Sequence, residues 1–223
     1  RLQTDVIDIY QLHWPNRGSY HFRQNWRYDP SQQDRAATRA NMLEVLQAAQ
    51  AAVDAGKIRH FALSNESAWG TAQWLQIAEA EGLPRVQSIQ NEYSLLCRLY
   101  DTDLGELAVN EQVTLLAYSP LAAGLLTGKY QGGAVPPGSR MDRNGNLGGR
   151  KTDRVFPAVD AYLDLATRHG LDPVHMALAF TVQRPFPVST IFGATTSEQL
   201  SRILAGLGTT LSDELLEPID EIH

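Results

Sequence analysis

The chain of 223 residues is 43% hydrophobic and 20% charged, a composition that allows a sizeable core and favours one large domain. Its formal net charge is −6, with 19 basic residues among 25 acidic ones, so there is no basic excess to neutralise phosphates and we expect no nucleic-acid partner. A single cysteine, Cys97, excludes an internal disulfide framework and agrees with a reducing compartment, so we expect a cytoplasmic protein.

The amino terminus carries no apolar signal region, and the longest apolar stretch, residues 115–126, is interrupted by Ser119, Pro120 and Gly124. The sequence therefore predicts no membrane span. The chain opens on Arg1 rather than on Met and runs at once into a predicted strand, which indicates that the start is internal to a longer protein.

Five apolar or β-branched runs are predicted to be strands, and they alternate with helical stretches as in βαβ units. These runs are residues 6–12, 58–63, 86–89, 113–117 and 188–192. Helices are expected over residues 40–55, 68–81, 103–110, 156–169, 173–184, 197–207 and 212–222. Residues 131–153, rich in Gly, Pro, Arg and Asn, predict a long irregular excursion. This alternation of strands and helices is typical of a β/α barrel. A closed barrel needs about eight strands, however, so three strands are unaccounted for.

Polar or glycine-bearing residues follow every predicted strand. They are His13, Ser64-Asn65, Gln90-Asn91, Tyr118-Ser119 and Gly193-Ala194-Thr195-Thr196. In a β/α barrel the active site is built at the carboxyl ends of the strands. Taken singly, these residues are better explained as helix caps and turns where each strand leaves the core, and His13 beside Trp14 and Pro15 is better explained as a core histidine.

Six segments, in order along the chain, resemble the aldo-keto reductases, most closely the bacterial Tas-like members. The matching segments are residues 8–15 (DIYQLHWP), 56–65 (GKIRHFALSN), 87–96 (QSIQNEYSLL), 118–130 (YSPLAAGLLTGKY), 176–180 (MALAF) and 193–200 (GATTSEQL). The resemblance implies an incomplete (β/α)8 TIM barrel in which strands 4 to 8 and their helices are present. Residues 1–223 would then be a single domain, the carboxy-terminal two thirds of the barrel.

Family members reduce aldehydes or ketones with NADPH, using a tyrosine, an aspartate, a lysine and a histidine. The resemblance implies that His13 is the catalytic histidine, orienting the carbonyl and stabilising the charge that develops on its oxygen. The other three residues would lie on strands ahead of Arg1, so the chain alone should be inactive. Trp14, with Trp26 and Tyr28, could form an apolar rim for a small-molecule carbonyl substrate, although all three could equally be packing aromatics.

The resemblance also implies a set of residues that bind NADPH. Ser64, Asn65 and Gln90 would hydrogen-bond the nicotinamide carboxamide, and Tyr118 would stack on the nicotinamide ring. The remaining contacts would be Ser119, Pro120 and Leu121 along the pyrophosphate, Lys129 and Arg140 at the 2′-phosphate, and Gly193, Thr195 and Gln199 at the adenosine. For Lys129 and Arg140 the alternative is a pair of solvated loop charges.

The chain departs from the family near the adenine, where Arg202 and Ile203 replace a common Glu-Asn pair. Arg202 could add a charge near the 2′-phosphate or simply face solvent.

Other chemistries leave no motif in the sequence. There is no His-Glu-x-x-His, no cysteine pair for zinc, no Gly-x-Ser-x-Gly and no P-loop, so no metal is expected. The rival interpretation is a cofactor-binding regulatory subunit that resembles the potassium-channel beta subunits. Substrate identity and oligomeric state stay open.

Overall fold

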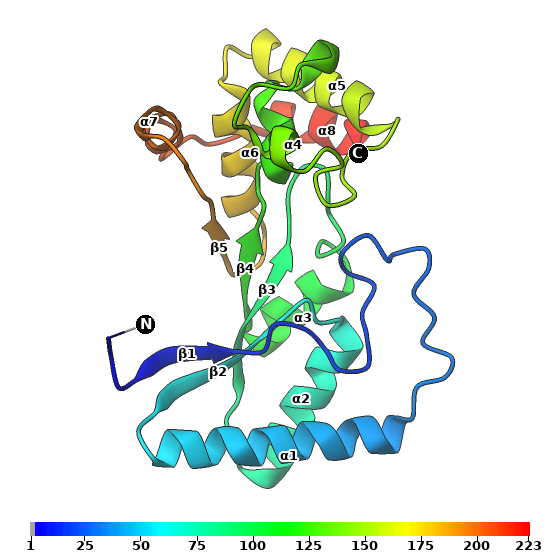
Figure 1. Ribbon diagram of the computed structural model, residues 1–223, viewed down its shortest axis with the longest axis vertical. Helices are drawn as coiled ribbons and strands as arrows, with labels where there is room; N and C mark the ends of the chain where they lie inside the picture. The colour runs from blue at the N-terminus through cyan, green and yellow to red at the C-terminus, as the bar shows by residue number, and fades with distance from the viewer. Residues whose placement is uncertain (1–2) are drawn as a thin grey trace. The chain divides into compact units, whose positions relative to one another are not determined.

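The computed structural model describes residues 3–223, whereas Arg1 and Leu2 lie outside the described residues (Figure 1). All five predicted strands are present, as β1 (Ile7–Gln11), β2 (Ile58–Ser64), β3 (Val86–Glu92), β4 (Thr114–Tyr118) and β5 (Val188–Ile191). They form one parallel sheet in the order β1-β2-β3-β4-β5. Consecutive parallel neighbours are what successive βα units produce, so the α/β class is confirmed.

Every predicted helix is present, although its bounds can differ from those expected. The helices are α1 (Arg35–Asp54), α2 (Ala68–Glu81), α3 (Asp103–Glu111), α4 (Arg140–Arg143), α5 (Val155–Arg168), α6 (Pro173–Val182), α7 (Ser197–Ala205) and α8 (Asp213–Ile222), with two 3-10 segments, η1 (Ala122–Thr127) and η2 (Gln131–Gly133). Helix α1 begins at Arg35 rather than near residue 40, because the Asp34 carboxylate accepts the Ala37 N–H and caps it. The predicted excursion is not wholly irregular, since η2 and α4 lie within it.

The described chain divides into two compact units. The first contains residues 3–91 and 101–116, and the second contains residues 92–100 and 117–223. Strands β3 and β4 each run from one unit into the other. A single domain over residues 1–223 stays a prediction.

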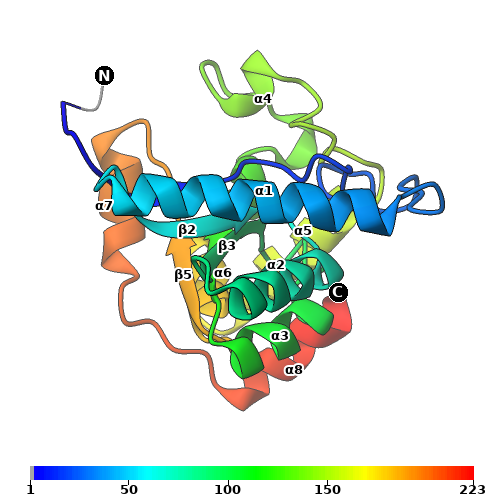
Figure 2. The same ribbon diagram turned by 90° about the horizontal axis from the view of Figure 1, so that it is seen from below.

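In the first unit, α1 lies along β2 and beside α2 (Figures 1 and 2). Phe61 and Leu63 of β2 are buried, and the Phe61 ring lies 5.6 Å from that of Trp74 on α2. Helix α2 is fixed at both ends, because Ser67 Oγ accepts the Gly70 N–H and Gly82 ends the helix at a left-handed φ of 64°.

In the second unit, α5 packs against α6 and α8, and α6 also contacts η1, β5 and α7. Its core is aromatic: the Tyr93 ring stacks on Phe180 at 5.9 Å, and Phe186 lies 5.2 Å from Tyr100. Asp172 caps α6 and Pro173 occupies its first turn, where a missing N–H costs nothing.

Candidate functional site

The carboxyl ends of β1, β2 and β3 are joined by hydrogen bonds among the predicted site residues. Asn65 Nδ2 donates to the His13 carbonyl oxygen at 2.9 Å and to Ser64 Oγ at 3.0 Å. The Gln90 carbonyl oxygen accepts from Ser64 Oγ at 2.7 Å and from the Asn65 N–H at 3.1 Å. The structure therefore brings His13, Ser64, Asn65 and Gln90 together from three successive strand ends.

Two features of this cluster are compatible with binding a ligand that carries an amide group. Asn65 has a left-handed φ of 55°, a conformation that Asn tolerates better than most residues and that is common at functional sites. Gln90 Oε1 accepts from Gln11 Nε2 at 3.2 Å, while the Gln90 side-chain N–H groups make no hydrogen bond to another described residue. The Ser64 hydroxyl and the Asn65 side-chain N–H groups already donate within the cluster, so the donor that it leaves for a carboxamide is Gln90 Nε2.

The imidazole of His13 is exposed and lies beside aromatic rings of the loop that follows β1. Phe22 lies 6.3 Å from it in an edge-on arrangement, and Trp14 stacks on Phe22 at 4.8 Å. Phe22 therefore lies between the rings of His13 and Trp14, and the substrate role of Trp14 stays a prediction. Of the other rim candidates, Trp26 is 97% exposed, and the Tyr28 hydroxyl accepts a hydrogen bond from Gln33 at 2.5 Å. Among the described residues, neither ring contacts that of His13.

Sequence reasoning missed a buried ion pair that anchors the same loop. Arg17 donates to both carboxylate oxygens of Glu66, to one of them at 3.1 Å. The Glu66 carboxylate also accepts from Trp74 Nε1 at 3.2 Å and from the Ser67 N–H at 2.7 Å. A Cβ on Gly70 would overlap both partners, since it would lie 2.1 Å from Arg17 and 2.2 Å from Glu66. No local signal points to this pair, because its partners lie 49 residues apart.

In the second unit, the backbone after β4 follows a left-handed path through several non-glycine residues. Positive φ values occur at Ser119 (56°), Ala122 (47°) and Ala123 (59°). The predicted pyrophosphate segment, Ser119-Pro120-Leu121, lies at its start. The N–H groups of Ser119 and Leu121 make no hydrogen bond to another described residue. These two backbone N–H groups therefore lie, without a partner among the described residues, where the family resemblance predicts the pyrophosphate. Tyr118, which ends β4, accepts the Tyr93 N–H through its carbonyl at 3.2 Å.

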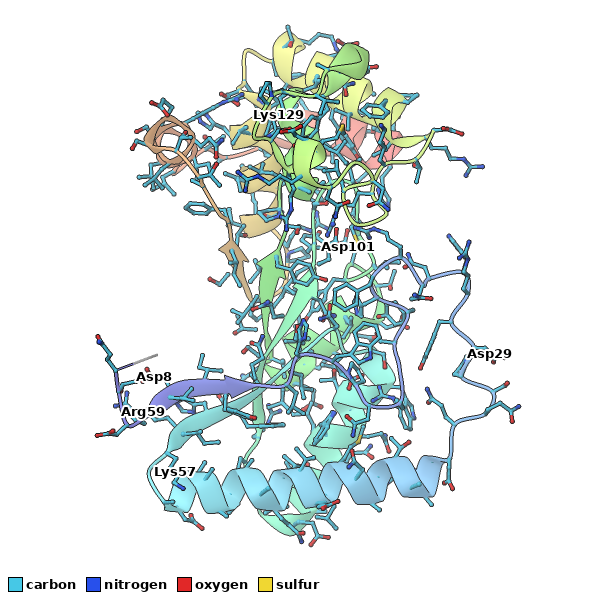
Figure 3. All side chains as sticks on the ribbon, viewed as in Figure 1. Asp8, Asp29, Lys57, Arg59, Asp101 and Lys129 are labelled. Atoms are coloured by element: carbon cyan, nitrogen blue, oxygen red, sulfur yellow. The ribbon has the colours of Figure 1, made fainter. Side chains whose placement is uncertain are left out.

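The segments that carry Lys129 and Arg140 are joined through the neighbours of these two residues. The Tyr130 hydroxyl accepts the Met141 N–H at 3.3 Å, which ties the Lys129-Tyr130 segment to the start of α4. Lys129 lies in the second unit (Figure 3). Its Nζ is 5.1 Å from the centre of the Tyr130 ring. It occupies space that Gly124 leaves open, because a Cβ there would lie 2.8 Å from Lys129 Cε and 3.0 Å from Nζ. Arg140 is exposed. An ammonium and a guanidinium are both groups that bind a phosphate dianion, so the predicted 2′-phosphate contacts of Lys129 and Arg140 stay a prediction.

The three residues predicted at the adenosine are exposed and lie where β5 leads into α7. Gln199 Oε1 accepts the Thr195 N–H at 3.0 Å and the Thr195 hydroxyl at 3.2 Å, so these two residues are joined, and Gly193 lies in the same loop. Arg202 instead forms a bidentate pair with Asp172 at 2.7 and 2.8 Å. Ile203 is only 4% exposed and packs in the core, so the departure at these positions serves helix packing.

Arg150 is a second residue that the sequence did not single out. Its Nε donates to the buried Glu92 carboxylate at 2.9 Å, its NH1 donates to the Leu147 carbonyl at 2.9 Å, and its NH2 lies 3.5 Å from Ser119 Oγ. One guanidinium thereby joins the end of β3, the segment after β4 and the excursion.

None of the helices within residues 3–223 has the length and the hydrophobicity that a membrane-spanning helix needs. The same residues contain no group of three or more His, Cys, Asp or Glu side chains arranged to hold a metal ion.

The parallel sheet and its polar strand ends define an α/β protein built from βα repeats. The whole chain, residues 1–223, matches the aldo/keto reductase family, and it therefore belongs to that family.

The chain is similar to several curated relatives. It is 43% identical over 227 residues to protein Tas of Escherichia coli strain K12, covering all of this chain and 63% of that protein. It is 33% identical over 168 residues to a probable voltage-gated potassium channel subunit beta of Arabidopsis thaliana. This match covers 69% of this chain and 51% of that protein. It is 29% identical over 218 residues to an NADH-specific methylglyoxal reductase of E. coli. This match covers 96% of this chain and 58% of that protein. The chain thus spans less than two thirds of the length of these relatives.

Proposed function

We propose that this chain is the carboxy-terminal part of a cytoplasmic (β/α)8-barrel reductase and supplies barrel strands 4 to 8. The complete protein would reduce a small aldehyde or ketone to an alcohol with NADPH. The observation that carries the proposal is the hydrogen-bonded cluster of His13, Ser64, Asn65 and Gln90 at three successive strand ends. Polar residues that converge from strand ends are what a barrel active site requires.

Each predicted site residue has a distinct role in this proposal. NADPH, when bound, supplies the hydride that reduces the carbonyl carbon. Ser64, Asn65 and Gln90 would hold the carboxamide of the cofactor, and Tyr118 would stack on its nicotinamide ring. The exposed His13 imidazole donates a hydrogen bond to the carbonyl oxygen and stabilises the negative charge that grows there. The Trp14 ring forms the adjacent apolar wall.

We propose NADPH rather than NADH, although the methylglyoxal reductase relative is NADH-specific by name. The support is that the Tyr130–Met141 hydrogen bond joins the segments that carry Lys129 and Arg140, because two cations suit the extra phosphate of NADPH. Ser119, Pro120 and Leu121 would follow the pyrophosphate, and Gly193, Thr195 and Gln199 the adenosine. A preference for NADH in direct binding titrations would remove Lys129 and Arg140 from the site.

The catalytic tyrosine, aspartate and lysine of the family would belong to strands that precede Arg1. We therefore expect residues 1–223 alone to give no turnover, and the same chain joined to its upstream sequence to oxidise NADPH when aldehydes are added. The measurement is the absorbance of the reduced nicotinamide over a panel of aldehydes and ketones. Turnover by residues 1–223 alone would contradict the missing-strand assignment.

His13→Ala in the full-length protein tests the catalytic assignment. We expect kcat to fall about 10²- to 10³-fold, the usual cost of removing one donor to a developing oxyanion, with little change in the dissociation constant for NADPH. His169→Ala, which removes an exposed histidine at the end of α5, is the matched control and should leave both constants unchanged. Unchanged kcat in His13→Ala would remove His13 from the mechanism.

The alternative is an NADPH-binding regulatory subunit, which the similarity to a probable potassium channel subunit beta supports. A regulatory subunit would bind NADPH tightly and turn over none of the aldehydes in the panel. The same titration and the same assay therefore distinguish the two functions.

A further inference from the structure

The guanidinium of Arg150 connects three segments that are distant in the sequence. It donates to the carboxylate of Glu92, 58 residues away, and approaches Ser119 Oγ, 31 residues away. Glu92 and Arg150 have side-chain exposures of 3% and 17%, so the ion pair is largely removed from water. A planar guanidinium can serve several acceptors at once in fixed directions, which a lysine cannot.

Within the excursion that carries Arg140, a local contact with Leu147 orients the Arg150 guanidinium toward Glu92 and Ser119. Arg150 NH1 donates to the Leu147 carbonyl at 2.9 Å, and the Leu147 side chain is only 2% exposed. By contrast, Arg143 on the same excursion is exposed, with no hydrogen bond or ion pair from its side chain to another described residue. The Arg150 side chain therefore attaches this excursion to Glu92 and Ser119, whereas the Arg143 side chain is exposed to solvent.

The contact with Ser119 reaches the segment whose backbone donors are open. Ser119 has a φ of 56°, an unusual conformation for serine that needs support from its surroundings. With Arg150 beside its hydroxyl, the Ser119 side chain has a partner in the protein, while the N–H groups of Ser119 and Leu121 are left for a ligand. The charge of Arg150 is balanced by Glu92, so its role is to hold geometry rather than to supply a free cation.

We propose that Arg150 is a positioning residue for the pyrophosphate of the bound dinucleotide. By tying Glu92, Ser119 and Leu147 together, it holds the backbone donors of the segment after β4 in a preformed arrangement. A preformed site binds more tightly because less ordering remains for the ligand to impose. The inference rests on the proposed function, since it assigns a further residue to the same cofactor site.

The test compares cofactor fragments on the full-length protein and its Arg150→Met variant by fluorescence titration. NADPH contains the pyrophosphate, whereas reduced nicotinamide mononucleotide lacks the pyrophosphate and the adenosine. We expect the dissociation constant for NADPH to rise about 10- to 100-fold, as for the loss of hydrogen bonds to a charged group, and that for the mononucleotide to stay unchanged. Arg150→Lys, which keeps the charge without the fork, should restore only part of the affinity.

Two controls make the result decisive. Arg143→Met should bind NADPH as the wild type does, and Glu92→Gln should weaken NADPH binding in the same selective way as Arg150→Met. Equal binding of NADPH by Arg150→Met and the wild type would overturn the inference, and so would an equal loss for both ligands, because a general structural role would not spare the mononucleotide. If the wild type bound no NADPH, the proposed function itself would fail.

Discussion

At the scale of single residues, Gly124 determines where the Lys129 ammonium lies. The glycine has a φ of 95°, and the space beside it is filled by the end of the lysine side chain. The ammonium is confined between Gly124 and the Tyr130 ring. The lack of a side chain at Gly124 is therefore what allows the Lys129 ammonium to occupy this position in the proposed phosphate site.

Gly124→Ala should lower the affinity for NADPH more than the affinity for NADH. The new methyl group would displace Lys129, and only NADPH carries the 2′-phosphate that Lys129 would meet. The measurement is the ratio of the two dissociation constants. Gly132→Ala is the control, because Gly132 also has a left-handed φ, 64°, but nothing within 4 Å of an added Cβ. An equal change of the ratio in both variants would assign the effect to backbone strain.

Arg17 and Glu66 form a buried pair whose disruption should be costly. Arg17→Met leaves a carboxylate of 2% exposure without its cation, and we expect the free energy of unfolding to fall by about 3–5 kcal/mol. Arg85→Met removes the exposed pair with Glu111, whose partners are 44% and 46% exposed, and should cost about 0–1 kcal/mol. Urea denaturation of both variants measures the difference. Similar losses in both would contradict this account.

At the scale of elements, Tyr162 attaches α5 to the segment that follows β3. Its hydroxyl donates to the Leu95 carbonyl at 3.1 Å, and burial raises the pKa of Tyr162 from 10.0 to about 12. A raised folded-state pKa means that the unfolded chain loses this proton first as the pH rises. The stabilising contribution is complete below pH 10.0 and is lost as the pH approaches about 12.

Tyr162→Phe tests this linkage. We expect the variant to be less stable than the wild type at neutral pH by about 1 kcal/mol, the usual net value of one hydrogen bond. The difference in Tm between the two proteins should then shrink as the pH rises from 9 toward about 12, because only the wild type has this hydroxyl to ionise. A difference in Tm that stays constant over this range would contradict the assignment.

At the scale of the whole molecule, burial is uneven across the sheet. In β2, Phe61, Ala62 and Leu63 are all at most 2% exposed, and in β3 Val86 and Ile89 are fully buried. Three of the five residues of β1 are exposed, as are two of the four residues of β5. We expect the amides of β2 and β3 to exchange with solvent most slowly and those of β1 and β5 much faster. Exchange followed by mass spectrometry measures this, and uniform protection of all five strands would contradict it.

The sequence predicted the elements well because each carries a local signal. Periodic apolar residues marked the helices, and Gly82 and Pro173 marked boundaries that the structure confirms. Residues far apart in sequence carry no such signal, so the Arg17–Glu66 and Arg150–Glu92 pairs were missed. The left-handed conformation of Ser119 was missed as well, because serine gives no sign of it.

The candidate site was predictable only in part. The strand ends located His13, Ser64, Asn65 and Gln90, and the structure brings these four together. The cofactor roles of these and the remaining residues came from the family resemblance and stay predictions. Arg202 illustrates the limit: its pairing with Asp172 depends on how α6 and α7 pack, which no local pattern encodes.

The order of the strands has a practical consequence for handling the protein. Among the described residues, β1 and β5 are the outermost strands of an open sheet, and each has an unpaired row of backbone donors and acceptors on one side. Such rows are templates on which another copy of the chain can add a strand. Residues 1–223 purified alone should therefore self-associate as concentration rises, and dilute, cold storage with early removal of aggregates would suit them best.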